Sequence, residues 1–229
     1  MCYNMSGDNM IYNNTVFGSF VKRLNRFTAK VLIDGNIETV HVKNTARLGE
    51  LLLEGAEVCL QISDNPNRKT KYDLISVVKP NLGWVNIDSQ VSNIIVHDYL
   101  KDSNYINIKP EFTYGKSRID FYAEKNGEKY LIEVKGCTLE FDNVGYFPDA
   151  PSIRAVKHLN ELTHALEEGY RSMVIFVSAM NGVTEVCPYE KNDPDFAEAF
   201  HMAEKAGVVI KTLPCKIGFN SIKYISKTE

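Results

Sequence analysis

The chain has 229 residues, of which 44% are hydrophobic and 24% are charged, the composition of a soluble globular protein with one large or two small domains. No apolar run approaches the roughly 20 residues that a membrane-spanning helix needs. The start, "MCYNMSGDNM", lacks the basic and apolar segments of a signal peptide. Five scattered cysteines without a CxxC pair indicate reduced thiols rather than disulfides or a zinc site. We therefore expect a cytoplasmic protein with no membrane partner.

The charges are unevenly distributed, although the net charge of −3 is not typical of a nucleic-acid-binding protein. Residues 15–80 carry ten Lys and Arg against seven Asp and Glu, whereas residues 81–229 carry sixteen against twenty-one. A basic front half and an acidic back half favour two modules with different roles. Acidic clusters can also be metal sites, because a bound cation offsets their charge.

Residues 15–80 have the pattern of a small β-barrel. Short apolar runs alternate with turn signals, of which "DGN" is a strong hairpin signal, and the runs "AEVCLQIS" and "YDLISVVK" flank the polar loop "DNPNRKT". Several short strands with almost no helix indicate a barrel of the OB type. The polar residues 1–14 are predicted to be a flexible N-terminus, and "KPNLGW" to be the domain boundary.

Residues 81–229 have the pattern of alternating helices and strands. Three helices are predicted: "DSQVSNIIVHDYLKDS", capped by Asp88 or Ser89; "PSIRAVKHLNELTHALEEG", whose apolar stripe begins at Ile153; and "DPDFAEAFHMAEKAG", capped by Asp193. Strands are predicted in "YINIKPEFTYG", "SRIDFYAEK", "EKYLIEVKG", "RSMVIFVSAM" and "VVIKTLP". The order α-β-β-β-α-β-α-β predicts an α/β domain with a mixed sheet.

The run "YLIEVKGCTL" places Glu133 and Lys135 on one face of a strand that is otherwise apolar. The preceding "EKNGEK" fits a two-residue hairpin turn at its Asn-Gly pair. In the register that this turn sets, Asp120 lies directly opposite Glu133, with the two Cβ atoms about 4.5–5.5 Å apart. Two facing carboxylates on a sheet flanked by helices are costly unless they share a proton or a cation.

A hard divalent cation removes this conflict. Mg²⁺ or Mn²⁺ would be bound by Asp120 and Glu133 together with water and a substrate phosphate. Lys135 would then orient or activate the attacking water, or stabilise charge on the phosphate. The pattern predicts that these three residues hydrolyse a phosphodiester; the alternative is a solvated network of ion pairs at a sheet edge.

Several segments resemble the sugar fermentation stimulation protein A family. They are "SRIDF", "YLIEVKGCTL" and "GYFPDAPSIRAVKHLNEL" in the back half and "VKRLNRFTAKV", "VKNTARLGELL" and "NRKTKYDL" in the front half. The resemblance implies an N-terminal OB-like barrel (residues 15–80) and a restriction-endonuclease-like PD-(D/E)xK domain (residues 81–229), with DNA binding of little sequence preference. The class motif falls on Asp120, Glu133 and Lys135.

Two further acidic residues match family positions. Glu111 resembles an acidic position that precedes the motif, and it is either another catalytic carboxylate or a charged residue at the start of a strand. Asp149 lies in "YFPDA", which also resembles a family signature, and the simplest role for it is to cap the helix that follows.

Basic residues in both halves are candidates for contacts with nucleic acid. OB-type barrels bind nucleic acid through basic grooves, and the N-terminus of a helix favours a phosphate. Such binding weakens steeply with salt. Ordinary solvated charges are the alternative explanation. The candidates are Lys22, Arg23, Arg26, Arg68, Lys69, Lys71, Arg154, Lys157 and His158.

Two functions of different classes are consistent with these features. The first is a divalent-metal-dependent nuclease that acts on double- or single-stranded DNA. The second, to which the family name points, is a catalytically silent DNA-binding regulator of sugar metabolism genes. The complete trio favours the first, because a pure DNA-binding protein gains nothing from two opposed carboxylates near phosphate. A homodimer is also compatible with the sequence, since barrels and exposed sheet edges often associate.

Overall fold

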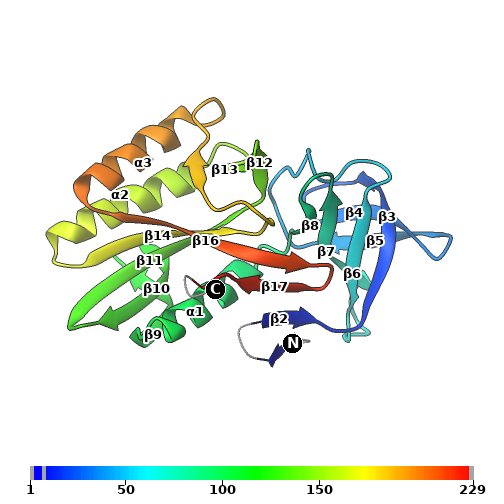
Figure 1. Ribbon diagram of the computed structural model, residues 1–229, viewed down its shortest axis with the longest axis horizontal. Coiled ribbons are helices and arrows are strands. Elements are labelled where there is room, and N and C mark those ends of the chain that lie inside the picture. Colours follow the sequence, from blue (N-terminus) through cyan, green and yellow to red (C-terminus); the bar gives the residue numbers. More distant parts are fainter. Residues whose placement is uncertain (1–2, 7–8, 227–229) are drawn as a thin grey trace.

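A computed structural model describes residues 3–6 and 9–226 (Figure 1). A β-barrel lies on the right of the view, and an α/β domain with a long twisted sheet lies on the left. Within the described ranges, no helix combines the length and the apolar character needed to cross a membrane.

The barrel is built from β3 (Thr15–Arg23), β4 (Thr28–Ile33), β5 (Asn36–Val42), β6 (Glu57–Ile62), β7 (Tyr72–Lys79) and β8 (Gly83–Asn86). The sheet order is β5-β4-β3-β6-β7-β8, and a short parallel pairing of β5 with β7 closes its first five strands into a barrel. This is the OB topology that the sequence pattern predicts. The predicted "DGN" hairpin joins β4 to β5, with positive φ angles at Asp34 and Gly35.

The domain boundary lies later in the chain than predicted. The segment "KPNLGW" forms the turn between β7 and β8, and β8 pairs with β7 as part of the barrel sheet. The connection to the second domain therefore follows Asn86. Turn residues such as Pro80 and Gly83 mark a change of chain direction, which a hairpin needs as much as a domain boundary does.

The N-terminal region is more ordered than expected from its composition. Strand β1 (Tyr3–Ser6) pairs with β2 (Asn9–Tyr12), and β2 pairs with β17 (Ser221–Tyr224) near the other end of the chain. Met10 and Tyr12 are fully buried. The prediction of a flexible segment over residues 1–14 is wrong for these strands; residues 1, 2, 7 and 8 lie outside the described ranges.

The second domain contains a mixed sheet, as predicted. Its order is β1-β2-β17-β16-β14-β11-β10-β9, in which β11, β14 and β16 run parallel and their outer neighbours are antiparallel. Figure 1 shows α1 on one face and α2 with α3 on the other. The bounds are β9 (Ile106–Tyr114), β10 (Ser117–Lys125), β11 (Glu128–Cys137), β14 (Arg171–Ser178), β16 (Val209–Gly218), α1 (Val91–Asp102), α2 (Ile153–Glu167) and α3 (Pro194–Ala206). A small sheet that the sequence analysis did not predict contains β12 (Leu139–Phe141), β13 (Val144–Phe147) and β15 (Val186–Pro188).

The helix ends show which capping predictions hold. Asp193 caps α3 by accepting a hydrogen bond from the Phe196 N–H, as predicted. At the start of α1, Gln90 makes no side-chain capping bond, and the predicted cap Asp88 accepts a hydrogen bond from the Gln90 N–H through its Oδ1 at 3.0 Å. Ser152 caps α2, whereas Asp149 accepts a hydrogen bond from the Leu48 N–H of the barrel at 3.0 Å.

Asp149 therefore joins the two domains instead of capping a helix. The apolar stripe of α2 also differs from the prediction at its first position, because Ile153 is 90% exposed while Leu159 and Leu162 are buried.

Candidate active site

The hairpin between β10 and β11 has the predicted register. Phe121 pairs with Ile132 and Lys125 with Glu128 across the turn at Asn126-Gly127. Asp120 precedes Phe121 in β10, and its Oδ2 accepts a hydrogen bond from the Val134 N–H of β11 at 2.8 Å. The second oxygen of Asp120, Oδ1, accepts a hydrogen bond from Asn93 Nδ2 of α1 at 3.1 Å. The carboxylate of Asp120 is thus fixed at the point where its strand parts from β11.

Glu133 is the most buried residue of the predicted trio, with 3% of its surface exposed. Its Oε1 accepts a hydrogen bond from Lys135 Nζ at 2.5 Å and also contacts Nδ1 of His158 on α2. Its Oε2 is buried and has no hydrogen-bond partner in the structure. A carboxylate oxygen in this condition carries a desolvation cost that a cation would remove.

His158 holds Glu133 in place. Its other ring nitrogen, Nε2, lies 3.5 Å from Arg154 Nε, which can only donate. This contact favours the tautomer in which Nδ1 carries the hydrogen and donates it to Glu133. The pattern of basic residues along α2 predicted that His158 contacts nucleic acid, but its imidazole is buried between α2 and the sheet.

The pKa values of the two carboxyl groups are shifted in opposite directions. Burial and the charge of Glu133 raise the pKa of Asp120. Burial also acts to raise the pKa of Glu133, but the contacts with His158 and Lys135 outweigh it, and the pKa is lowered. Glu133 therefore keeps its charge at neutral pH, and a cation between the two groups would favour ionisation of both.

The donor set fits a hard cation that keeps water and substrate ligands. No group of three or more His, Cys, Asp and Glu arranged to hold a metal ion occurs in residues 3–6 and 9–226. Mg²⁺ does not require such a cage, because one or two carboxylates with water and phosphate are its usual ligands in phosphoryl-transfer sites. Asp120 and the unpartnered Oε2 of Glu133 supply that minimum.

Glu111 lies apart from this buried group. It follows Pro110 in β9 and has a left-handed φ of 52°. Its side chain is 67% exposed and forms an ion pair of 3.6 Å with Arg118. A glutamate with left-handed backbone angles is strained, which is a common feature of functional segments. The carboxylate of Glu111 does not contact the predicted trio in this structure.

Arg23 is not available to a phosphate. Its guanidinium donates five hydrogen bonds to the backbone carbonyl groups of residues 25, 26, 44, 46 and 47. These bonds use all five of its N–H donors and join the β3–β4 turn to the loop after β5. Of the predicted nucleic-acid contacts on the barrel, Lys22, Arg26, Lys69 and Lys71 are exposed.

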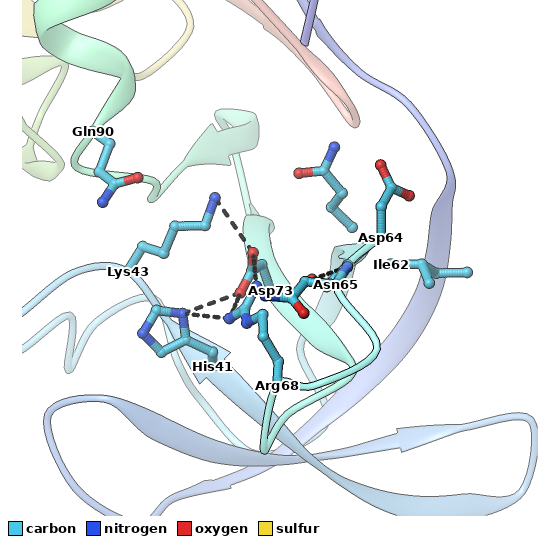
Figure 2. Close-up of a pocket in the computed structure, with 10 residues that line it drawn as sticks. His41, Lys43, Ile62, Asp64, Asn65, Arg68, Asp73 and Gln90 are labelled. Carbon is cyan, nitrogen blue, oxygen red and sulfur yellow. Dashed lines mark hydrogen bonds and ion pairs between the residues drawn. The ribbon is translucent and has the colours of Figure 1, made fainter. Parts of the chain in front are cut away.

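Arg68 is also engaged within the barrel. Figure 2 shows its guanidinium and the ring of His41 converging on Asp73, with Lys43 on the other side. The Arg68–Asp73 pair is bidentate, at 2.6 and 2.9 Å, and Lys43 Nζ lies 3.6 Å from the same carboxylate. These residues line a cavity of about 540 Å³. Because Asp73 offsets their charge, the cavity is less cationic than its Lys and Arg content suggests.

On α2, Arg154 and Lys157 are exposed, and Lys157 forms a weak ion pair with Glu161 at 3.5 Å. Sequence reasoning missed the role of Asn93 and the contact of His158 with Glu133. Both depend on how α1 and α2 pack against β10 and β11. The helical periodicity indicates which residues face the sheet, but it does not indicate which strand residue they meet.

Comparison with known proteins gives consistent results. Family models of the SfsA N-terminal OB domain and the sugar fermentation stimulation protein RE domain match residues 21–87 and 89–221. The sugar fermentation stimulation protein homolog of Clostridium beijerinckii is 46% identical over 217 residues, covering 93% of this chain and 96% of that protein. The homolog of Desulfitobacterium hafniense is 45% identical, with 93% and 95% covered.

One solved structure matches over almost the full length. It is Pyrococcus furiosus SfsA in complex with Ca²⁺, which is 27% identical, with a TM-score of 0.86 and 96% of each chain covered. The arrangement of an OB barrel followed by a restriction-endonuclease-like domain is therefore shared with a protein whose structure contains a divalent cation.

Proposed function

The chain belongs to the sugar fermentation stimulation protein family, and we propose that it binds DNA with little sequence preference and hydrolyses a phosphodiester bond with a divalent metal ion held by Asp120 and Glu133. The observation that carries this proposal is the state of Glu133. It is buried and ionised, one of its oxygens has no partner, and it lies beside a second carboxylate. The Ca²⁺ in the structure of the Pyrococcus furiosus relative supports a divalent ion.

The metal, Mg²⁺ or Mn²⁺, would supply Lewis acidity and a bound water of lowered pKa. The residues of the chain provide the framework for this chemistry. Val134 and Asn93 orient Asp120, and His158 orients Glu133. Lys135 uses one N–H donor on Glu133 and has two more for a phosphate oxygen or a water.

Exposed basic side chains in both domains would contact the DNA backbone. We retain Lys22, Arg26, Lys69, Lys71, Arg154 and Lys157 for this role and exclude Arg23 and His158, whose donors are engaged inside the fold. Arg68 could contact the DNA backbone only if its guanidinium broke its hydrogen bonds with Asp73 or bonded to Asp73 and a phosphate at once. We assign Glu111 no ligand role, since its carboxylate faces Arg118.

A cleavage assay tests the proposal. Plasmid and single-stranded DNA are incubated with Mg²⁺ or Mn²⁺ and wild-type protein, Lys135→Ala, or Lys116→Ala, an exposed lysine in the β9–β10 turn. We expect Lys135→Ala to lose about 10²-fold or more of the cleavage rate, as removal of a group that stabilises developing charge does. Lys116→Ala should cut as the wild type does. Absence of metal-dependent cutting by the wild type would contradict a nuclease.

A catalytically silent DNA-binding regulator is the second candidate. It is favoured by the contacts of Glu133 with Lys135 and His158, which already offset its charge without a metal. A protein of this class would retard DNA in a salt-dependent way. Its DNA affinity would be the same with a divalent ion and with a chelator, and no DNA would be cut.

A further inference from the structure

A cavity of about 380 Å³ lies between the barrel and the α/β domain. The barrel contributes residues 44–46 and Arg26, and the second domain contributes residues 136–139 at the end of β11 and residues 146–152 before α2. The connecting segment 86–89 forms another part of the wall. No residue of the predicted trio lines this cavity, so its relation to the trio depends on β11.

Strand β11 links the cavity to the trio. Glu133, Lys135 and Cys137 alternate along the strand and so share one face of it. Cys137 lines the cavity. Gly136 lines it as well, so along β11 the cavity begins directly after Lys135. A ligand that filled the cavity and continued along this face would pass Lys135 and then Glu133.

Hydrogen bonds join the parts of the chain that form the cavity. The Leu48 N–H donates to the lining residue Asp149 at 3.0 Å, and Asn44 Nδ2 donates to the Ile87 carbonyl at 3.1 Å, both of these residues being part of the lining. Outside the lining, Lys79 Nζ donates to Glu140 Oε2 of the second domain at 2.5 Å.

An intact duplex is too large for this space. The cavity volume is in the range of pockets that hold one small molecule, about 300–1,000 Å³. A duplex is much larger than such a molecule, since one groove of B-DNA is already about 12 Å wide. The side chains of Glu133 and Lys135 are only 4% and 13% exposed, so a phosphate must also enter the protein to reach them. A single strand can do this, because its backbone can bend and its bases need not remain paired.

The lining groups suit a nucleotide. Arg26 and the N-terminal ends of α1 and α2 favour a phosphate. The two carboxylates of the lining are engaged elsewhere, Asp88 with Lys43 and Asp149 with the Leu48 N–H. Hydroxyl groups that could donate to sugar or base oxygens are contributed by Thr45, Ser92, Thr138 and Ser152.

We propose that this cavity holds one nucleotide of a single DNA strand beside the phosphate that the trio engages, so that the substrate is single-stranded DNA or the frayed end of a duplex. This inference rests on the proposed function, because it names the substrate class of the same site.

Binding can be measured independently of cleavage. A fluorescent single strand is titrated with protein in Ca²⁺, and the unlabelled strand and its blunt duplex are compared as competitors. The titration is repeated with Thr45→Trp, which fills the cavity from an exposed loop position, and with Thr184→Trp, a matched change at an exposed threonine outside the cavity. Thermal melting shows whether each variant folds.

We expect the single strand to bind about tenfold or more tightly than the duplex, and Thr45→Trp to lose about tenfold, which is the scale of one base contact. Thr184→Trp should bind as the wild type does. Equal or tighter binding of the duplex would overturn the inference, whichever way the variants behave and even if Thr45→Trp does not fold. A folded Thr45→Trp protein that binds the single strand with wild-type affinity would also overturn the inference. Either result leaves the nuclease proposal standing, whereas no binding of any DNA would remove both.

Discussion

Arg23 ends β3 and Arg26 lies three residues later in the β3–β4 turn, and the structure gives them different roles. Arg23 donates to five backbone carbonyls, whereas the Arg26 side chain is exposed and lines the cavity between the domains. The sequence "VKRLNRFTAKV" does not distinguish them, because both are arginines within one short basic stretch. The difference arises from the path of the loop after β5, which surrounds one guanidinium and not the other.

This contrast gives a prediction for the pair. Arg23→Lys should lower the free energy of unfolding by about 2–4 kcal/mol, since an ammonium cannot replace five bonds that each contribute about 0.5–1.5 kcal/mol. Arg26→Lys should leave stability unchanged. Urea unfolding measures both, and equal stability of the two variants would contradict the structural role of Arg23.

Asp73 makes the stability of the barrel dependent on pH. Burial acts to raise its pKa, but the hydrogen bonds and charges of Arg68, Lys43 and His41 outweigh burial, and the folded-state pKa is lowered. A carboxyl of this kind stabilises the fold above its unfolded pKa of about 3.9. That contribution is lost as the pH falls through the folded-state value.

Asp73→Asn should therefore be less stable than the wild type at pH 7 by about 3–5 kcal/mol, the cost of removing one partner from a buried charged group. The difference should shrink as the pH falls from about 4 through the lowered folded-state pKa, because the carboxyl is protonated first in the unfolded chain and only then in the folded protein. Urea unfolding at several pH values tests this, with Asp34→Asn on the exposed β4–β5 turn as the control. A difference that stays constant with pH would argue against the ion-pair account.

At the scale of elements, β2 shows where sequence reasoning fails. It lies in a short segment rich in asparagine, and its partner β17 lies about two hundred residues later in the chain. Local patterns cannot reveal such a pairing. The β10–β11 hairpin is the opposite case. Its strands are adjacent in sequence and its turn is an Asn-Gly pair, so local rules predicted the register that the structure has.

The burial of β2 predicts that it contributes strongly to stability. Tyr12→Ala should lower the free energy of unfolding by about 3–5 kcal/mol, as for other large buried rings. Asn13→Ala, at the exposed next position, should change it by less than about 0.5 kcal/mol. A small effect of Tyr12→Ala in a denaturant titration would show that the fold does not need β2.

At the scale of the whole molecule, the sequence pattern predicted two modules of the correct types but not how they meet. Lys43 of the barrel pairs with Asp88 at 2.9 Å, and Tyr12 of β2 donates to the same carboxylate at 3.3 Å. Asp149 bonds to the barrel rather than to its own helix. Such contacts depend on the docking of the domains, which neither periodicity nor capping rules address.

The candidate site was predicted in part for the same reason. The hairpin register that local rules predict is present from Phe121–Ile132 to Lys125–Glu128, and Asp120, just beyond it, bonds to the Val134 N–H. The contacts of Glu133 with His158 and of Asp120 with Asn93 require α2 and α1 to be packed on the sheet. The unpartnered Oε2 of Glu133, on which the proposed metal site depends, is visible only in the folded protein.

Calorimetric titration of Ca²⁺ and Mg²⁺ into the protein tests that metal site most directly, with Asp120→Asn and Asp34→Asn compared under the same conditions. We expect one ion to bind to the wild type and to Asp34→Asn, and binding to be lost in Asp120→Asn, because one of the two carboxylate ligands is then neutral. Equal binding by Asp120→Asn and the wild type, or no binding by the wild type, would contradict a metal centre at Asp120 and Glu133.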